Sequence, residues 1–141
     1  MLRGKAVACG DEHTLVLDVN GKALGAGSNE HGQLGTGTKD SDCAFVPVVG
    51  LTERISGLAA GTKHSLFLTE SGKALAAGLN HKGQLGTGDT HNQSVPVEVK
   101  APGLVFKALK ASSFSAGLTD TGDVYLWGEN PSFGESLTPA K

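Results

Sequence analysis

The sequence predicts an all-β protein assembled from a repeated unit of about 51 residues. Three observations lead to this prediction: a gapless internal repeat, short runs of alternating apolar residues, and many glycines. Residues 10–37 align with residues 61–88 at about 17 of 28 identical positions, far more than chance similarity gives. A third copy begins at Ala111, one residue out of phase. Self-similarity at a fixed period is typical of propellers and other repeat arrays.

Each copy has the pattern of a β-hairpin. In the first copy Leu15 and Leu17 alternate with other residues, which is the period of a strand. A pair ending in glycine then separates this run from a second apolar run, and we expect a two-residue turn whose positive φ values match the twist of the strands. The three expected turns are Asn20-Gly21, Ser71-Gly72 and Thr121-Gly122.

Two further apolar runs complete each unit. One precedes the hairpin, and the other lies between copies, around Pro47 and Pro96. Because proline cannot donate a backbone hydrogen bond, this last strand should occupy a sheet edge or begin with the proline. Four short antiparallel strands per unit are the signature of a propeller blade. We therefore expect a partial β-propeller, in preference to a sandwich or barrel whose strands would occupy non-equivalent environments.

Composition narrows the classes of function. The 21 glycines among 141 residues follow no three-residue period, which excludes collagen, and 38% hydrophobic residues suffice for a folded core. So many glycines indicate turns and close backbone approaches. The formal net charge is −2, and Lys and Arg form no dense stripe, so we expect neither a nucleic-acid partner nor a membrane surface.

Cys9 and Cys43 have no metal-ligand or disulfide-framework spacing and are expected to be reduced thiols. The first residues lack the apolar core of a signal peptide, and no run approaches membrane-spanning length. We therefore expect an intracellular protein, either cytoplasmic or nuclear.

Two motifs carry a resemblance to a known family. The pattern G-x-x-H-[ST]-L occupies residues 10–15 and 61–66, and G-x-N-x-x-G-Q-L-G-x-G occupies residues 27–37 and 78–88. In these motifs the sequence resembles the RCC1 (regulator of chromosome condensation) repeat family over nearly its whole length. The resemblance implies propeller blades of roughly 50 residues and a ring of seven.

The third copy departs from the motifs. Phe114 stands at the histidine position, and the glycine-rich element is missing after Asn130. The tail from Glu135 to Pro139 is expected to be either a loop or an ordered edge.

We expect one propeller segment over residues 1–141, with repeats at approximately 5–50, 51–100 and 101–141. We expect this segment to form part of a larger ring. These amount to about two and three-quarter repeats, and the first unit is expected to lack a preceding edge strand, whereas the smallest propellers have four blades. Three explanations remain open: a longer protein, a ring completed by another chain or by self-association, or a tail that caps a free-standing arc.

The motif residues are expected to build the blades. The G-Q-L-G element lacks the Lys and Ser/Thr of a phosphate-binding loop, so its glycines should lie where blades approach and Leu34 and Leu85 should fill the core. His13 and His64 should hydrogen-bond backbone groups of a turn in their own blade. Trp127 aligns with small residues of the other copies and should pack in the core.

Enzyme chemistry has little support in the sequence. There is no Gly-x-Ser-x-Gly element, and His31, His81 and His91 match no zinc-ligand spacing, so we expect no catalytic residues, metal or cofactor. The irregular segments 38–45 and 89–94 are polar and differ between copies, which favours contact with partners. The candidate contact residues are Lys39, Asp40, Asp42, Asp89, His91, Asn92 and Gln93.

The favoured function is accordingly a non-catalytic scaffold for protein–protein interaction. The partners would be other proteins, with further blades from the same or another chain. The alternative, implied by the resemblance, is guanine-nucleotide exchange on a Ras-like small GTPase. Fold resemblance alone does not establish that activity.

Overall fold

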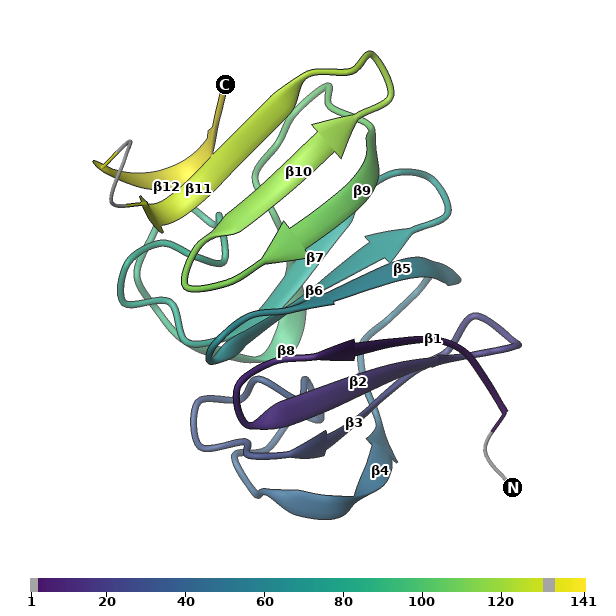
Figure 1. The fold of residues 1–141 in the computed structure, drawn as a ribbon. Helices are drawn as coiled ribbons and strands as arrows, with labels where there is room; N and C mark the ends of the chain where they lie inside the picture. The colour runs from purple at the N-terminus through teal and green to yellow at the C-terminus, as the bar shows by residue number, and fades with distance from the viewer. Residues whose placement is uncertain (1–2, 131–133) are drawn as a thin grey trace.

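A computed structural model describes residues 3–130 and 134–141, and over these residues the protein is all-β (Figure 1). Its strands form three four-stranded antiparallel sheets, which confirms the predicted fold class. We call them blades 1, 2 and 3. Blade 1 contains β1 (Gly4–Cys9), β2 (His13–Asp18), β3 (Ala23–Gly27) and β4 (Asp42–Pro47). Blade 2 contains β5 (Ile55–Ala60), β6 (His64–Thr69), β7 (Ala74–Gly78) and β8 (Gln93–Glu98). Blade 3 contains β9 (Phe106–Ala111), β10 (Ser115–Thr119), β11 (Val124–Asn130) and β12 (Gly134–Ala140).

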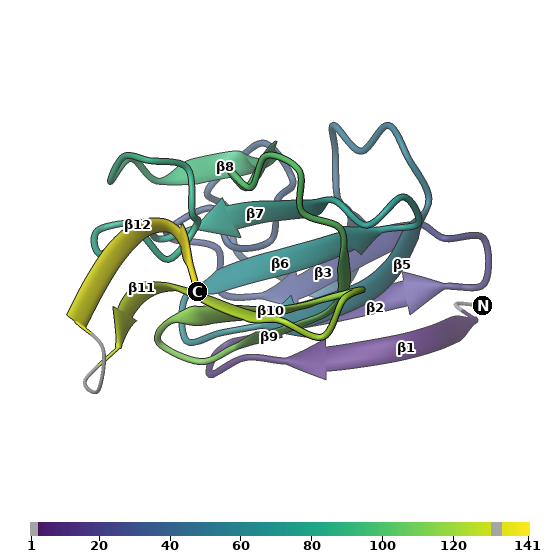
Figure 2. The same cartoon turned by 90° about the horizontal axis from the view of Figure 1, so that it is seen from above.

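The blades are stacked face to face in chain order, with blade 1 lowest and blade 3 highest in Figure 1. In each blade the strands follow one another in sequence order across the sheet. Strand β5 contacts β1 and β2, and β9 contacts β5 and β6, so the first strands of the blades lie together. From above, the sheets overlap, with β8 at one side and β1 and β9 at the other (Figure 2). No helix in the described residues is long and apolar enough to cross a membrane.

The hairpin turns differ from the expected two-residue form. In blade 1 the N–H of Gly21 donates to the carbonyl of Asp18 at 3.2 Å, and the N–H of Asp18 donates to the carbonyl of Lys22 at 2.8 Å. The loop therefore has three residues, and only its glycine has a positive φ, of 79°. A type I turn followed by a left-handed glycine spares Asn20 the strained conformation that a two-residue turn would require.

The turns are also stabilised by side chains. The Asp18 carboxylate accepts the backbone N–H groups of Asn20 and Lys22, at 2.8 and 2.9 Å. In blades 2 and 3, the hydroxyls of Thr69 and Thr119 accept the equivalent second bond. The short polar residue three positions before the glycine thus determines the shape of each turn.

The fourth strand of each blade is an edge strand, as the prolines predicted. Strand β4 ends at Pro47, Pro96 lies within β8, and each strand pairs with one neighbour in its sheet. The tail forms β12 and completes blade 3, which settles the choice between a loop and an ordered edge. Blade 1 has all four strands, contrary to the expected missing edge strand, because each edge strand follows its hairpin in the chain.

The hydrophobic core lies between the blades. Leu15 and Leu17 of blade 1 share one cluster with Phe67 of blade 2. Leu66 precedes Phe67 on β6, so its side chain lies on the opposite face of the sheet. It belongs to a second cluster, shared with blade 3, and both faces of blade 2 are therefore covered. Trp127 is only 1% exposed in this second cluster, which confirms its predicted packing role. Its ring centroid lies 5.9 Å from that of Phe106.

Candidate functional site

A buried asparagine organises the long loop that joins β3 to β4. Asn29 is fully buried, and its side-chain nitrogen donates to the Thr36 hydroxyl and to the carbonyls of Thr38 and Asp40, at 3.0–3.2 Å. Its side-chain oxygen accepts the N–H of Leu34 at 2.9 Å. The loop is therefore tied to the blade from within, although its outer residues are exposed.

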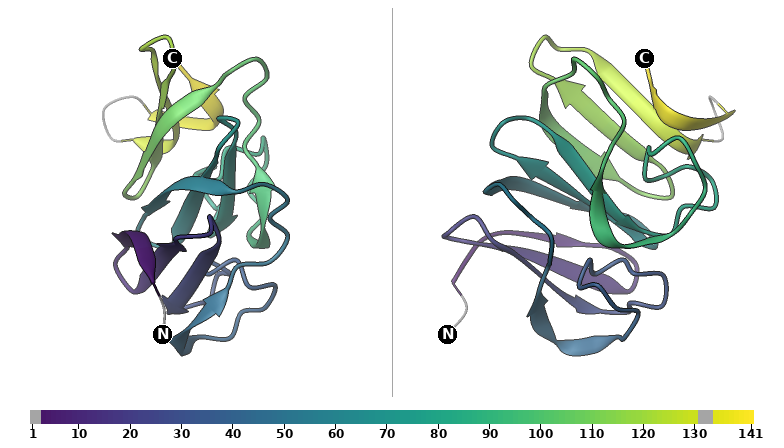
Figure 3. Two further views of the ribbon diagram at one scale, coloured as in Figure 1. Left: turned by 90° about the vertical axis from the view of Figure 1, so that its right-hand side faces the viewer. Right: turned by 180° about the vertical axis from the view of Figure 1, so that it is seen from behind.

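Asn80 repeats this arrangement in the loop that joins β7 to β8. Its side-chain nitrogen donates to the carbonyls of Asp89 and His91, both at 3.1 Å, and its oxygen accepts the N–H of Leu85 at 2.9 Å. The backbone N–H of Asn80 donates to the Asn92 side chain at 2.9 Å. The two loops lie at the same side of the stacked blades (Figure 3).

The candidate contact residues have different surroundings in these loops. Lys39, Asp40 and Asp42 are exposed in the first loop and at the start of β4. His91 and Asn92 are exposed in the second loop. These residues are thus available to a partner, and their role in contact stays a prediction.

Asp89 and Gln93 are half-buried. The Asp89 carboxylate accepts the backbone N–H of His91 and the Thr87 hydroxyl, and these bonds lower its pKa. Asp89 therefore stabilises the loop itself. Gln93 begins β8, where the loop of blade 1 approaches: a Cβ on Gly32 would lie 2.8 Å from the Gln93 carbonyl oxygen.

The glycine-rich loops bind the next blade along the chain. The N–H of Gly37 donates to the Ser94 carbonyl in blade 2 at 2.9 Å, and the N–H of Gly88 donates to the Leu137 carbonyl in blade 3 at 3.0 Å. A Cβ on Gly32 would lie 2.6 Å from the Ser94 Cα, so only glycine fits there. This confirms that the glycines lie where blades approach. The motif leucines, Leu34 and Leu85, are fully buried as predicted.

The motif histidines also join neighbouring blades. His64 Nε2 lies 2.8 Å from Ser115 Oγ in blade 3, and that hydroxyl donates to the Gln84 carbonyl in the blade 2 loop at 2.7 Å. His13, Ser65 and Gln33 form the same chain between blades 1 and 2. The prediction of backbone bonds within each histidine's own blade was wrong. The signal for these bonds between blades was the serine that follows the histidine position in blades 2 and 3, because its hydroxyl forms a hydrogen bond with the histidine of the preceding blade.

The hydroxyl fixes the protonation of the histidine. A serine has one proton, and Ser115 donates it to the Gln84 carbonyl, so its oxygen accepts from Nε2–H of His64. Among the described residues His64 Nδ1 is buried without a hydrogen-bond partner, as expected of a neutral ring that carries its proton on Nε2. Burial lowers the pKa of His64 to about 3, and burial also lowers the pKa of His13.

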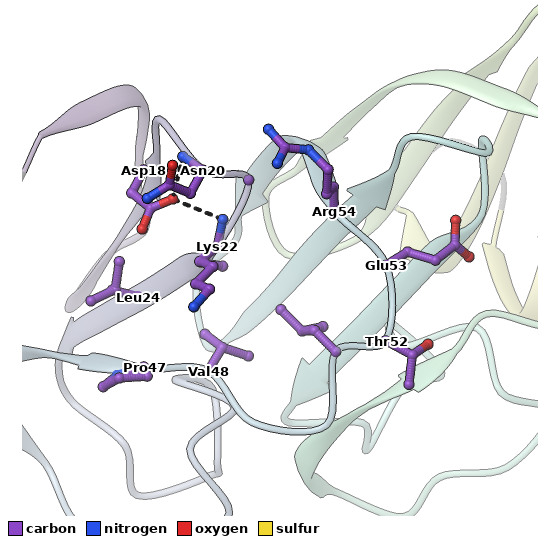
Figure 4. A pocket seen from close by; sticks show the side chains of 12 residues that line it. Asp18, Asn20, Lys22, Leu24, Pro47, Val48, Thr52, Glu53 and Arg54 are labelled. Atoms are coloured by element: carbon purple, nitrogen blue, oxygen red, sulfur yellow. Dashed lines mark hydrogen bonds between the residues drawn. The ribbon is translucent and has the colours of Figure 1, made fainter.

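Sequence reasoning missed a cleft beside the first hairpin. It has a volume of about 660 Å³ and lies between blade 1 and the segment that leads to blade 2 (Figure 4). Leu24, Val48 and Leu51 give it an apolar lining, and Lys22 and Arg54 are among its charged residues. The described residues contain no cluster of three or more possible metal-ligating side chains, here or elsewhere.

Comparison with known proteins identifies the repeat. Two profiles described as the regulator of chromosome condensation (RCC1) repeat match the chain, one at residues 5–33 and 55–84, the other at residues 20–68 and 71–119. The chain belongs to the RCC1 repeat family. The resemblance inferred from the two motifs is thereby confirmed.

Several relatives contain this repeat. The chain is 41% identical to the X-linked retinitis pigmentosa GTPase regulator of Canis lupus familiaris over 88% of its length. It is 39% identical over 91% of its length to a mitochondrial RCC1 domain-containing protein, RUG3, of Arabidopsis thaliana. It is 34% identical over 88% of its length to the secretion-regulating guanine nucleotide exchange factor of Bos taurus. The chain spans only 13%, 29% and 29% of these relatives, respectively.

Solved structures share the fold. Human WBSCR16 superposes with a TM-score of 0.87 at 24% identity, over 97% of this chain and 37% of that one. Prp20p of Saccharomyces cerevisiae, described with its binding to Gsp1p and histones, superposes with a TM-score of 0.80 at 23% identity, over 98% of this chain and 38% of that one. These likenesses support the propeller arrangement of the blades.

Replacing Asn80 with alanine is expected to loosen the second loop. The change removes the amide that binds two loop carbonyls, those of Asp89 and His91, and the Leu85 N–H, and it should lower the free energy of unfolding by about 1–3 kcal/mol. Hydrogen exchange of the Leu85 amide and urea denaturation measure the two effects. Thr90→Ala, an exposed change in the same loop, should alter neither. Equal exchange in both variants would contradict the role given to Asn80.

Proposed function

We propose that this chain is a non-catalytic scaffold segment of an RCC1-type propeller that binds other proteins through its ordered polar loops. The observation that carries the proposal is the fully buried Asn29 and Asn80 behind loops that expose Lys39, Asp40 and His91. Loops that are already fixed lose less conformational entropy when a partner binds. Rigid scaffolds commonly present their binding residues on such loops.

The histidine–serine pairs favour a structural role over catalysis. A nucleophilic serine would donate its proton to the histidine, whereas Ser115 donates to a backbone carbonyl and accepts from His64. Both side chains are fully buried. The arrangement recurs between blades 1 and 2, as expected of blade construction.

Guanine-nucleotide exchange on a Ras-like small GTPase is the second candidate. The relative from Bos taurus is described as an exchange factor, and the Canis lupus familiaris relative as a GTPase regulator. Such an activity would require the chain to bind the GTPase and displace its nucleotide, without covalent chemistry. The proposed location is intracellular, and the Arabidopsis thaliana relative is described as mitochondrial.

Reversing charges in the first loop tests the scaffold proposal. Lys39→Glu combined with Asp40→Lys keeps the net charge and alters two exposed side chains. Cross-linking followed by mass spectrometry should identify a protein that binds the unaltered chain and is lost with this variant. The matched control is Lys107→Glu with Asp120→Lys, also exposed, which should retain that protein.

Identical cross-linked proteins for the unaltered chain and both variants would contradict binding through the first loop. Release of a fluorescent GDP analogue from small GTPases separates the candidates. Accelerated release by this chain would favour exchange, and unchanged release is expected of the scaffold.

A further inference from the structure

One threonine of strand β12 precedes a proline. Of the five prolines in the chain, only Pro139 follows a serine or threonine, and Lys141 stands two residues beyond it. A serine or threonine followed by proline, with a basic residue two positions further on, is the pattern that proline-directed protein kinases recognise. A motif this short also occurs by chance, so a role for Thr138 depends on its surroundings in the fold.

The backbone around Thr138 has the extended form in which kinases bind their substrates. Strand β12 is the edge of blade 3, with β11 as its neighbour (Figure 1). Between the pairs that flank them, residues 137–139 of β12 lie opposite the single residue Trp127 of β11. The ladder is therefore irregular at this point, as is common where a strand contains proline. An edge segment with few ladder bonds opens locally at small cost, without unfolding of its blade.

The same position in blade 2 stays open although a further blade follows it. Thr138 corresponds to Val95, because the residue before each accepts an N–H from the glycine-rich loop of the preceding blade. Val95 is 38% exposed with blade 1 on one side and blade 3 on the other. Thr138 is half-buried. The position therefore lies at the outer rim of the stacked blades, where a neighbouring blade does not cover it.

A cation lies beside this threonine. At the junction of blades 2 and 3, the ammonium of Lys100 and the methyl group of Thr138 lie 3.7 and 3.8 Å from a Cβ placed on Gly88. At the junction of blades 1 and 2, Val49 and Val95 lie 3.5 and 4.0 Å from a Cβ placed on the equivalent glycine. Two apolar side chains at one junction are thus replaced at the other by a lysine and a threonine.

A phosphate on Thr138 would lie next to this cation. The phosphoryl group carries a charge of about −1.5 to −2 at neutral pH and three strong acceptor oxygens. Lys100 is exposed and has no ion pair with any described residue, so its ammonium is available to those oxygens. The carboxylate of Asp89, in the same loop as Gly88, instead accepts bonds from Asn80 and from the Thr87 hydroxyl inside that loop.

We propose that Thr138 is a phosphorylation site for a proline-directed kinase, and that its phosphate binds Lys100 and fastens blade 3 to blade 2. In the reaction Thr138 Oγ1 attacks the γ-phosphorus of ATP, and the bond from that phosphorus to the bridging oxygen breaks. ADP leaves, and the hydroxyl proton passes to the catalytic aspartate of the kinase. The inference concerns one junction between blades and does not rest on partner binding by the loops.

Treatment of the folded chain with ATP and a purified cyclin-dependent kinase, a proline-directed enzyme, tests the modification. Mass spectrometry of the peptides should find one phosphoryl group, on Thr138. Thr138→Val, which reproduces the residue of blade 2, and Pro139→Ala should remain unmodified. Lys141→Gln should be modified more slowly than Lys107→Gln, an exposed change on β9. An unmodified Thr138 in the unaltered chain would overturn the proposal, as would equal modification of the Pro139→Ala variant.

The contact with Lys100 is tested on the phosphorylated chain. Urea denaturation at low ionic strength should show a higher midpoint than before phosphorylation, and added salt should reduce the gain. Phosphorus NMR should place the second pKa of the phosphate below its usual value of about 6, because a nearby cation favours the dianion. Lys100→Gln should abolish both changes, and Lys107→Gln should keep them. An unchanged midpoint, or the same phosphate pKa with and without Lys100, would overturn the proposal.

Discussion

Acidification from pH 6.5 towards pH 3 is expected to destabilise the chain through His64. The folded protein holds this histidine neutral, with a pKa of about 3, whereas an unfolded histidine has a pKa of about 6.5. The unfolded state therefore binds a proton that the folded state excludes. Above pH 6.5 the histidine is neutral in both states, and its burial costs no stability. As the pH falls from 6.5 towards 3, proton binding by the unfolded state lowers the free energy of unfolding. Each unit of difference corresponds to about 1.4 kcal/mol, which sets an upper limit of about 5 kcal/mol for this group.

The variant His64→Phe isolates this effect, because phenylalanine occupies the equivalent position in blade 3. Ser115 would keep its bond to the Gln84 carbonyl. Urea denaturation between pH 6.5 and pH 4.5 should show a shallower loss of stability than in the unaltered chain. His91→Gln, at an exposed position, should keep the original slope. Equal slopes for His64→Phe and the unaltered chain would show that His64 is not buried in neutral form.

Replacing Gly61 with alanine is expected to disrupt the contact between blades 2 and 3. A Cβ there would lie 2.4 Å from the Ser112 carbonyl oxygen and 2.4 Å from His64 Cε1. The Ser112 carbonyl cannot move freely, because it accepts the N–H of Thr62 at 3.0 Å. Overpacking of this kind should cost about 1–3 kcal/mol in the free energy of unfolding, measured by urea denaturation.

Gly57→Ala provides the matched control. Gly57 also lies in blade 2, has no positive φ, and would place its Cβ no closer than 3.5 Å to Leu68. Alanine there should be neutral or stabilise the chain by up to about 1 kcal/mol, since it restricts the unfolded chain. A similar loss in both variants would show that steric contact at Gly61 is not the cause.

Much of the fold was predictable from local patterns. The alternation around Leu15 and Leu17 predicted a strand, and Pro47 and Pro96 predicted edge strands, because these signals depend on neighbouring residues. The position of the turn at Asn20-Gly21 was predicted correctly, but its length was not, because the loop has three residues and not two. Its form depends on hydrogen bonds to Asp18 that a dipeptide signal does not include.

The roles of the polar motif residues were less predictable. His13 bonds to Ser65, fifty-two residues away, and only the stacking of the blades brings them together. Asp89 was expected to face partners, yet its carboxylate also holds its own loop. A repeat shows which residues recur in equivalent positions, but it does not show whether a recurring side chain contacts its own unit or the next.

The bond from a histidine to the hydroxyl of the following blade has a consequence for how repeats can be exchanged. The middle unit contributes a donor, His64, to one boundary and an acceptor, Ser65, to the other, so neither of the two pairs lies within a single unit. A duplicated or transplanted repeat is compatible only when its new neighbour supplies the missing half. The unit that must stay intact in such an exchange is therefore the junction between two repeats, which spans the end of one and the beginning of the next.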